Sequence, residues 1–189
     1  KVIFLSADAF GVLPPVSRLT EDQTRYYFLS GYTAKIAGTE RGIAEPVPHF
    51  STCFGATFLM LDPIIYANEL ARKMKLHKTE AWLVNTGWMG GTYYSGSRID
   101  LQTTRTIINA TLYGVMDGCE FKTIPVFNLA VPSEIEGVDQ NLLDPGKVWD
   151  SPRKWHIAAT DLAMKFILNF NKFSMNEETA KLANSGPRI

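Results

Sequence analysis

The stretch TGWMGGTYYSGSRI, residues 86–99, carries the glycine spacing of a phosphate-binding loop. Gly91 and Gly96 enclose four residues, as in the pattern G-x-x-x-x-G-K-[ST], whose backbone amides and lysine hold the phosphates of a nucleotide. Here Ser97 stands where the lysine belongs, and Arg98 comes one place too late to replace it. Because the main positive charge is absent, the sequence argues against a phosphate loop. An ordinary turn between a strand and a helix is the plainest interpretation.

A third interpretation is that the end of this stretch contacts the base of a nucleotide. The guanidinium of Arg98 can stack on an aromatic base, and the β-branched Ile99 can pack beside it. Thr104 would then supply a hydroxyl from the first turn of the following helix. These residue types suit a base and a ribose, and the residues alone do not decide between this interpretation and the simple turn.

Two further segments carry groups that can bind ligands. Asp8 follows an apolar run, at a place where α/β proteins put binding residues, but a turn aspartate that accepts local amides is favoured over a metal ligand. Thr39, Glu40 and Arg41 lie in a glycine- and proline-rich stretch from residue 30 to 50. An exposed Glu–Arg pair is usually a solvated surface, whereas in a lid it would close on a substrate anion.

The three histidines, His49, His77 and His156, share no motif with another metal ligand, so we expect no metal site in this sequence. No Ser-His-Asp arrangement or nucleophile elbow is present, so we assign no catalytic residue. The chain of 189 residues has a formal net charge of zero, which argues against nucleic acid or a membrane surface as partner. Cys53 and Cys119 stand far apart and are interpreted as reduced thiols of a cytoplasmic protein.

The pattern of apolar residues predicts alternating strands and helices, and hence an α/β fold, a mixed α+β lobe. Thr20 and Gln23 form a capping box at the start of a helix, and Asp62–Pro63 starts another that should bury Ile65, Leu70 and Met74. The predicted helices cover 21–29, 63–77, 102–114, 152–170 and 177–183, and the predicted strands cover 2–5, 58–61, 81–84 and 125–131. The helix from 102 should bury Ile107, Ile108 and Leu112, and the helix after Ser151–Pro152 should bury Trp155, Ala159, Leu162, Phe166 and Phe170. A buried strand at residues 2–5 with nothing before it suggests a piece of a longer polypeptide.

Several long stretches resemble ATP-dependent phosphoenolpyruvate carboxykinase. They are SADAFGVLPPV (6–16), LSGYTAKIAGTERG (29–42), HFSTCFGATF (49–58), LVNTGWMGG (83–91) with SRI (97–99), NLAVPSEIEGVD (128–139) and SGPRI (185–189). The resemblance implies that residues 1–189 are the C-terminal part of the enzyme, with a mobile lid at about 30–50. The phosphate loop and the N-terminal domain would lie upstream, in the rest of the same polypeptide.

Enzymes of this family convert oxaloacetate and ATP to phosphoenolpyruvate, ADP and carbon dioxide, in gluconeogenesis or its anaerobic reverse. The resemblance implies ATP with Mg²⁺, and Mn²⁺ held by residues outside this segment. By resemblance Arg98, Ile99 and Thr104 match the positions that contact adenine and ribose, and residues 30–50 match the lid. The fragment alone is expected to be inactive. The alternative is a stand-alone nucleotide-binding regulatory module without catalysis, and a guanine-nucleotide enzyme is a rival within the first class.

One departure from the family pattern concerns residues 89–95, MGGTYYS, which make the loop before Arg98 a few residues longer. Ser97 also stands where bacterial members more often have lysine. The longer loop puts its path in question more than the contact of Arg98 with the base.

Overall fold

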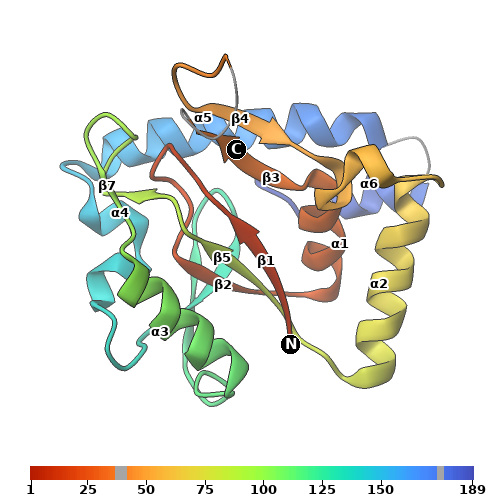
Figure 1. Ribbon diagram of the computed structural model, residues 1–189, viewed down its shortest axis with the longest axis horizontal. Helices are drawn as coiled ribbons and strands as arrows, with labels where there is room; N and C mark the ends of the chain where they lie inside the picture. The colour runs from red at the N-terminus through yellow and green to blue at the C-terminus, as the bar shows by residue number, and fades with distance from the viewer. Residues whose placement is uncertain (37–41, 174–176) are drawn as a thin grey trace.

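The computed structural model describes residues 1–36, 42–173 and 177–189 and shows a mixed α/β fold (Figure 1). Its centre is a five-stranded sheet of order β1-β5-β2-β9-β8. These strands are β1 (Val2–Ser6), β5 (Ala81–Asn85), β2 (Val16–Leu19), β9 (Leu129–Pro132) and β8 (Phe121–Ile124). β1 pairs with β5 in parallel, with Val2 opposite Ala81, and the other neighbours are antiparallel. The mixed sheet confirms the predicted fold class.

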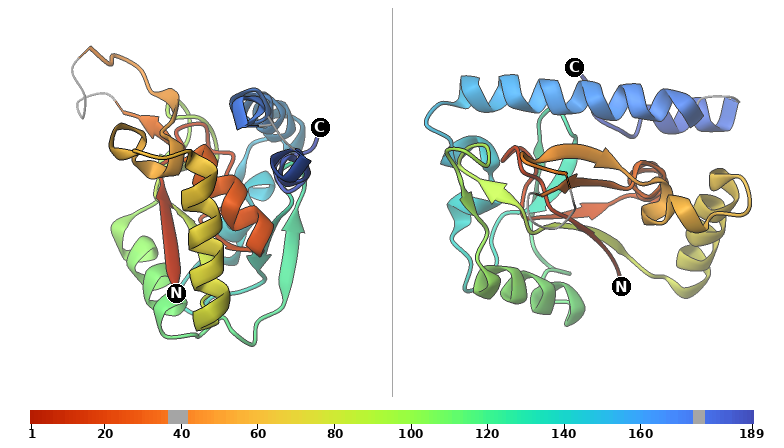
Figure 2. Two further views of the ribbon diagram at one scale, coloured as in Figure 1. Left: turned by 90° about the vertical axis from the view of Figure 1, so that its right-hand side faces the viewer. Right: turned by 45° about the horizontal axis from the view of Figure 1, so that its top comes forward.

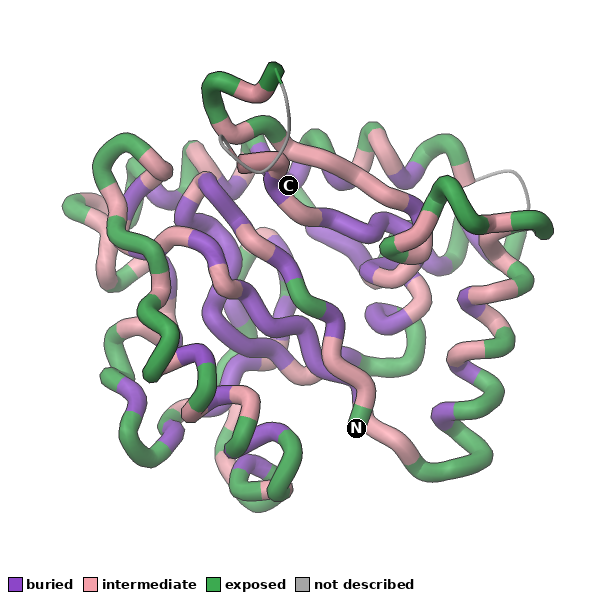
Figure 3. The backbone as a smooth tube through the Cα atoms, in the orientation of Figure 1, coloured by how far each residue is buried: buried purple, intermediate pink, exposed green. Residues whose placement is uncertain are grey.

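Helices cover both faces of this sheet. The helix α3 (Leu101–Leu112) lies on one side, and the long α5 (Pro152–Phe170) lies on the other (Figure 2). The helix α1 (Glu21–Ser30) packs beside α5, and α2 (Pro63–His77) packs beside α1. The short helices are α4 (Pro145–Val148), α6 (Glu177–Ala183) and the 3₁₀ turns η1 (Thr52–Phe54), η2 (Ala56–Phe58), η3 (Gln140–Leu143) and η4 (Asn171–Phe173). Burial is concentrated in the central strands, and every residue of β5 is buried (Figure 3).

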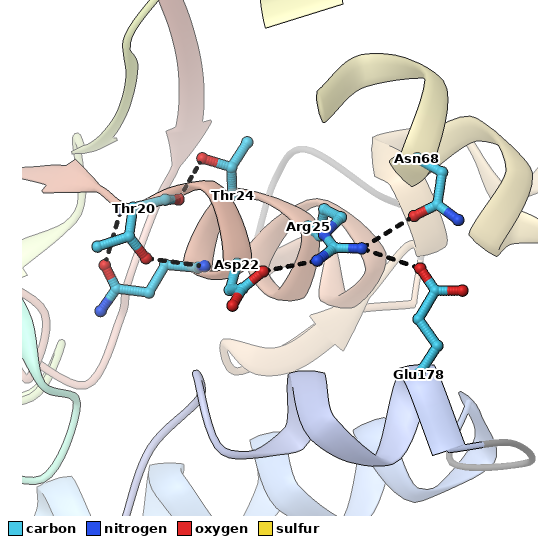
Figure 4. Close-up of polar contacts among 7 residues, drawn as sticks. Thr20, Asp22, Thr24, Arg25, Asn68 and Glu178 are labelled. Carbon is cyan, nitrogen blue, oxygen red and sulfur yellow. Dashed lines mark hydrogen bonds and ion pairs between the residues drawn. The ribbon is translucent and has the colours of Figure 1, made fainter. Parts of the chain in front are cut away.

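The capping signals in the sequence predicted the helix starts. The Thr20 hydroxyl accepts the amide of Gln23 at 3.2 Å, and the Gln23 side chain accepts the amide of Thr20 at 3.0 Å, which confirms the capping box (Figure 4). The carboxylate of Asp62 accepts the amide of Ile64 at the start of α2. At α5 the predicted apolar stripe is buried, although the Ser151 side chain makes no capping hydrogen bond.

The cluster around Arg25 joins three helices. Its guanidinium contacts Asp22 of α1 at 2.6 Å, Asn68 of α2 at 3.2 Å and Glu178 of α6 at 3.0 Å (Figure 4). The side chain is only 17% exposed, so these contacts lie partly out of water. Arg25 therefore ties the short α6 and the long α2 to α1.

Three predicted segments differ from the structure. Within residues 30–50, for which no strand was predicted, β3 (Tyr32–Lys35) and β4 (Val47–Phe50) pair as antiparallel strands. The strand predicted at 58–61 is wrong, because Phe58 ends a 3₁₀ turn and is 85% exposed. Residues 125–128 form the turn between β8 and β9, where Val126 and Asn128 adopt positive φ. Four-residue strands give too little alternation to be recognised.

In two helices, some of the residues predicted to be buried are exposed in the structure. In α2 Met74 is buried with Ala67 and Ala71, while Ile65 is 49% exposed. In α3 Ile107 is buried, but Leu112 is exposed at the last helical position before the turn that contains Gly114. In α2 small residues line much of the buried face, because this helix lies close to α1 and leaves little room for large side chains.

Candidate functional site

The candidate site lies at the edge of the sheet where β1 and β5 end. Since these strands are parallel, the loops that follow them leave from the same edge. The first loop, residues 7–15, leads from β1 to β2, and the second, residues 86–96, includes the short strand β6 (Trp88–Met89) and leads to β7 (Ser97–Arg98) (Figure 1). Both loops therefore meet in space although they lie about eighty residues apart in the chain.

Asn85, the last residue of β5, holds the two loops together. Its side-chain oxygen accepts the amides of Asp8 and Gly87, both at 2.9 Å, and its side-chain nitrogen donates to the carbonyl of Leu13 at 2.9 Å. Asn85 is only 1% exposed, so these bonds form away from water, where an unpaired amide would be costly. Sequence reasoning missed this residue, although a polar side chain that ends a buried apolar strand was a signal for it.

Asp8 organises the first loop from inside. Its carboxylate accepts the amides of Phe10 at 3.0 Å, Val12 at 2.7 Å and Leu13 at 2.9 Å, and the phenol of Tyr32 at 2.9 Å. Complete burial raises the pKa of Asp8, while the hydrogen bonds from the three amides and the phenol oppose that rise. The structure confirms the favoured interpretation of Asp8 as a turn aspartate.

The two loops approach each other so closely that glycine is required. A Cβ atom on Gly11, whose φ is +66°, would lie 2.0 Å from the carbonyl oxygen of Gly91. A Cβ atom on Gly87 would lie 2.0 Å from the carbonyl oxygen of Asp8. The amide of Trp88 donates to that same carbonyl at 2.7 Å. The second loop is thus built directly on the backbone of the first.

Three amides of the glycine-rich loop donate to carbonyl groups within the protein. The amide of Tyr93 donates to the carbonyl of Ala9 at 2.8 Å, and the amides of Ser95 and Gly96 both donate to the carbonyl of Thr92, at 3.0 and 2.7 Å. A phosphate loop needs such amides free to face an anion. Their internal use explains, together with the missing lysine, why this loop is unsuited to phosphates.

At the start of α3, the side chain of Asp100 already accepts hydrogen bonds from Thr103. The carboxylate of Asp100 accepts the amide of Thr103 at 2.8 Å and its hydroxyl at 2.6 Å. These bonds lower the pKa of Asp100, so a negative charge already sits at the positive end of the helix. A phosphate would be repelled here, whereas an uncharged base or ribose would not.

Arg98 projects from β7 at the exposed rim of this edge. Its Nε donates to the carbonyl of Thr86 at 3.1 Å, and its guanidinium carbon lies 5.3 Å from the centre of the Trp88 ring. β6 and β7 pair so that Arg98 stands opposite Trp88, and the half-buried Ile99 donates its amide to the carbonyl of Gly87 at 2.8 Å. The guanidinium is therefore oriented by one nitrogen, and its two terminal nitrogens stay open to solvent.

Thr104 lies one turn into α3 and is 9% exposed. Its amide donates to the carbonyl of Asp100 at 3.0 Å, and its hydroxyl has no hydrogen-bond partner in the part of the chain that the structure describes. Arg98, Ile99 and Thr104 thus come from one continuous segment, β7 and the beginning of α3. Arg98 is exposed, and Thr104 has little accessible surface.

Other predicted groups lie apart from this edge. Thr39, Glu40 and Arg41 fall outside the described residues. The residues that the structure describes contain no cluster of three or more His, Cys, Asp or Glu side chains able to hold a metal ion. Two pockets, of about 370 and 530 Å³, are lined by other residues and lie beside α2 and beside the loop after β9. In ranges 1–36, 42–173 and 177–189 no helix has both the length and the apolar character of a membrane span.

A family comparison gives this geometry a context. A model described as phosphoenolpyruvate carboxykinase, of the ATP-dependent class, matches residues 1–141 of the 189. The match contains the five sheet strands, both interlocked loops and the segment with Arg98, Ile99 and Thr104. It covers about three quarters of the chain and ends before α5. The chain therefore belongs to the phosphoenolpyruvate carboxykinase family.

Proposed function

We propose that this chain is the nucleotide-binding C-terminal part of an enzyme that converts oxaloacetate and ATP to phosphoenolpyruvate, ADP and carbon dioxide. In this proposal Arg98 and Ile99 contact the adenine and Thr104 contacts the ribose. The observation that carries it is the placement of Arg98, which lies exposed at the carboxyl edge of parallel strands in a chain of this family. Ligands of open α/β sheets bind at such an edge.

The contacts of Arg98 suit a stacking role. Because Nε is held by Thr86 and one side of the group faces Trp88, the guanidinium plane is fixed before a ligand arrives. A fixed planar cation loses little entropy when a base stacks on it. Such a contact contributes about 1–2 kcal/mol, which corresponds to about tenfold in affinity.

The phosphates and the metal ions are assigned to other residues in this proposal. The loop amides are used within the protein, and Asp100 holds the start of α3, so neither offers a place for phosphate. We therefore assign Mg²⁺ to the nucleotide phosphates, and Mn²⁺ and the reacting oxaloacetate to the part of the enzyme that would precede residue 1. Those ions would neutralise the charge that develops during decarboxylation and phosphoryl transfer.

The test compares Arg98→Ala with Arg105→Ala in the complete enzyme. Arg105 is an exposed arginine of α3 and serves as the matched control, because it carries the same charge and has no side-chain partner among the described residues. We expect Arg98→Ala to raise KM for ATP about tenfold and Arg105→Ala to leave it unchanged. An unchanged KM and kcat in Arg98→Ala would show that the assignment of Arg98 is wrong.

A second candidate function is a regulatory module that binds nucleotide without catalysis. The buried residues form one contiguous core around the sheet, which is the observation in its favour. Titrating the isolated chain 1–189 with ATP separates the two candidates. Tight, magnesium-dependent binding by a folded fragment supports the module, and its absence supports the enzyme. Comparing turnover with ATP and with GTP then tests the nucleotide preference.

A further inference from the structure

A pair of tyrosines stands at the tip of the hairpin that carries Arg98. The rings of Tyr93 and Tyr94 have their centres 4.0 Å apart, and Tyr94 is 71% exposed. The phenol of Tyr93 donates to the carboxylate of Glu45 at 3.2 Å. Glu45 lies in the segment just before β4, so this bond joins two loops that are distant in the sequence.

The backbone around Tyr93 is restrained by its contacts with neighbouring carbonyl groups. The amide of Tyr93 donates to the carbonyl of Ala9, and Gly96 closes the loop so tightly that a Cβ atom there would lie 2.5 Å from two carbonyl oxygens. The ring therefore projects from a backbone that is attached to the edge of the sheet. On the other side Glu45 is exposed and precedes a strand that pairs only with β3.

The carboxylate of Glu45 faces both phenols. The proximity of Glu45, and then that of Tyr93, raises the pKa of Tyr94 above its usual range.

We propose that Tyr93 and Glu45 are positioning residues for the nucleotide, because their hydrogen bond holds the segment before β4 against the hairpin that presents Arg98. This inference rests on the proposed function, in which ATP binds at that hairpin. Trp88 pairs with Arg98 and Met89 with Ser97, so the tip and the arginine belong to one two-stranded unit. A segment tied to the tip therefore stays beside the place where the base would stack.

The experiment measures steady-state kinetics of the complete enzyme with Tyr93→Phe, Glu45→Ala, the double variant and Glu45→Gln. We expect Tyr93→Phe and Glu45→Ala each to raise KM for ATP about threefold, the effect of one exposed hydrogen bond. The double variant should be no worse than either single variant, since all three lose the same bond. Glu45→Gln keeps an acceptor and should stay near the wild-type KM. Tyr113→Phe, which alters an 81% exposed tyrosine on the far end of α3, is the matched control and should have no effect.

A second readout does not depend on activity. Amide hydrogen exchange of peptides covering residues 42–50, measured without nucleotide, should be faster in Tyr93→Phe than in the wild type and unchanged in Tyr113→Phe. A wild-type KM in Tyr93→Phe would overturn the inference, and so would a wild-type exchange rate of residues 42–50. Additive effects in the double variant would also overturn it, because the two residues would then act separately.

Including Arg98→Ala in the same series tests the Tyr93–Glu45 hydrogen bond separately from the proposed nucleotide site at Arg98. If Arg98→Ala raises KM for ATP and Tyr93→Phe does not, the inference about the hydrogen bond fails and the proposed nucleotide edge stands. If Arg98→Ala has no effect, the proposed edge itself is wrong. The exchange experiment still reports in that case whether the bond orders residues 42–50.

Discussion

Replacing Asp8 by asparagine should loosen the loop between β1 and β2 without changing the size of the side chain. All four groups that face this carboxylate are donors, namely three backbone amides and the phenol of Tyr32. Asparagine offers one oxygen where aspartate offers two. Its amide nitrogen must therefore face donors, wherever it is placed.

The least costly orientation keeps the oxygen opposite the amides of Val12 and Leu13. The new amide nitrogen then faces Phe10 and Tyr32, so the Phe10 amide loses its acceptor and the phenol can accept but no longer donate. Each buried donor without an acceptor costs about 1–3 kcal/mol. Removing a buried charge offsets part of this, so we expect the free energy of unfolding to fall by about 2–4 kcal/mol.

Urea unfolding followed by tryptophan fluorescence suits this measurement because two indoles report on the loop. The indole nitrogen of Trp149 donates to the carbonyl of Gly11 at 2.9 Å, and that of Trp155 donates to the carbonyl of Val12 at 3.3 Å. In Asp8→Asn the emission should change at lower urea than in the wild type. The control is Tyr32→Phe, which removes one donor, leaves the three amide bonds and should cost about 1 kcal/mol.

The reasoning would be refuted by an Asp8→Asn variant whose unfolding free energy lies within about 0.5 kcal/mol of the wild type. It would also fail if Tyr32→Phe cost more than Asp8→Asn. In either case the backbone of the loop would hold its shape without the carboxylate. The close packing of the second loop would then be the dominant restraint.

Three further predictions concern stability. Gly11→Ala should lower the free energy of unfolding by at least about 3 kcal/mol, because the added carbon clashes with backbone and the φ angle is positive. Gly42→Ala also has a positive φ angle, but nothing lies within 4 Å of the added carbon, so it should cost about 1 kcal/mol in the same denaturation assay. Arg25→Ala should lower the unfolding free energy by about 2 kcal/mol by releasing contacts with three helices. Arg72→Ala removes one member of an exposed ion pair, whose arginine side chain is 60% exposed, and should leave the melting temperature unchanged. Asp100→Ala should lower the melting temperature at neutral pH but not in acid: the folded-state pKa is depressed, so the stabilisation is present above the unfolded pKa and is lost as pH falls through the folded one. A melting-temperature difference that persists at low pH would contradict this explanation.

The helices were predictable because their signals are local. The Thr20 capping box, the Asp62–Pro63 start and the apolar stripe of α5 each depend on residues within a few positions of one another. The hairpin β3–β4 was not predictable in this way. Its strands have four residues each, and Tyr32 is buried by Phe50 and by Phe166 of α5, a partner that local pattern does not reveal.

The candidate edge was predictable in part. Glycine spacing drew attention to residues 86–99, and the absent lysine argued against a phosphate loop. That the amide of Tyr93 donates to the carbonyl of Ala9 could not be predicted, because it is a contact between distant parts of the chain. The same holds for Asn85, whose three hydrogen bonds reach into both loops. Arg98, Ile99 and Thr104 remain a proposal that the kinetic experiments above test.

The parallel pairing of β1 with β5 has a consequence for how the protein folds. Ile3 of β1 pairs with Trp82 of β5, so forming this ladder closes a loop of nearly eighty residues. Such distant pairings cost chain entropy before any contact compensates for them, and they make folding slow. The Arg98 edge depends on this pairing, so it should form late, after the local helices α1 and α2. During synthesis β1 must wait for this partner until β5 has left the ribosome, and its edge that later pairs with β5 stays open to misassociation throughout that interval.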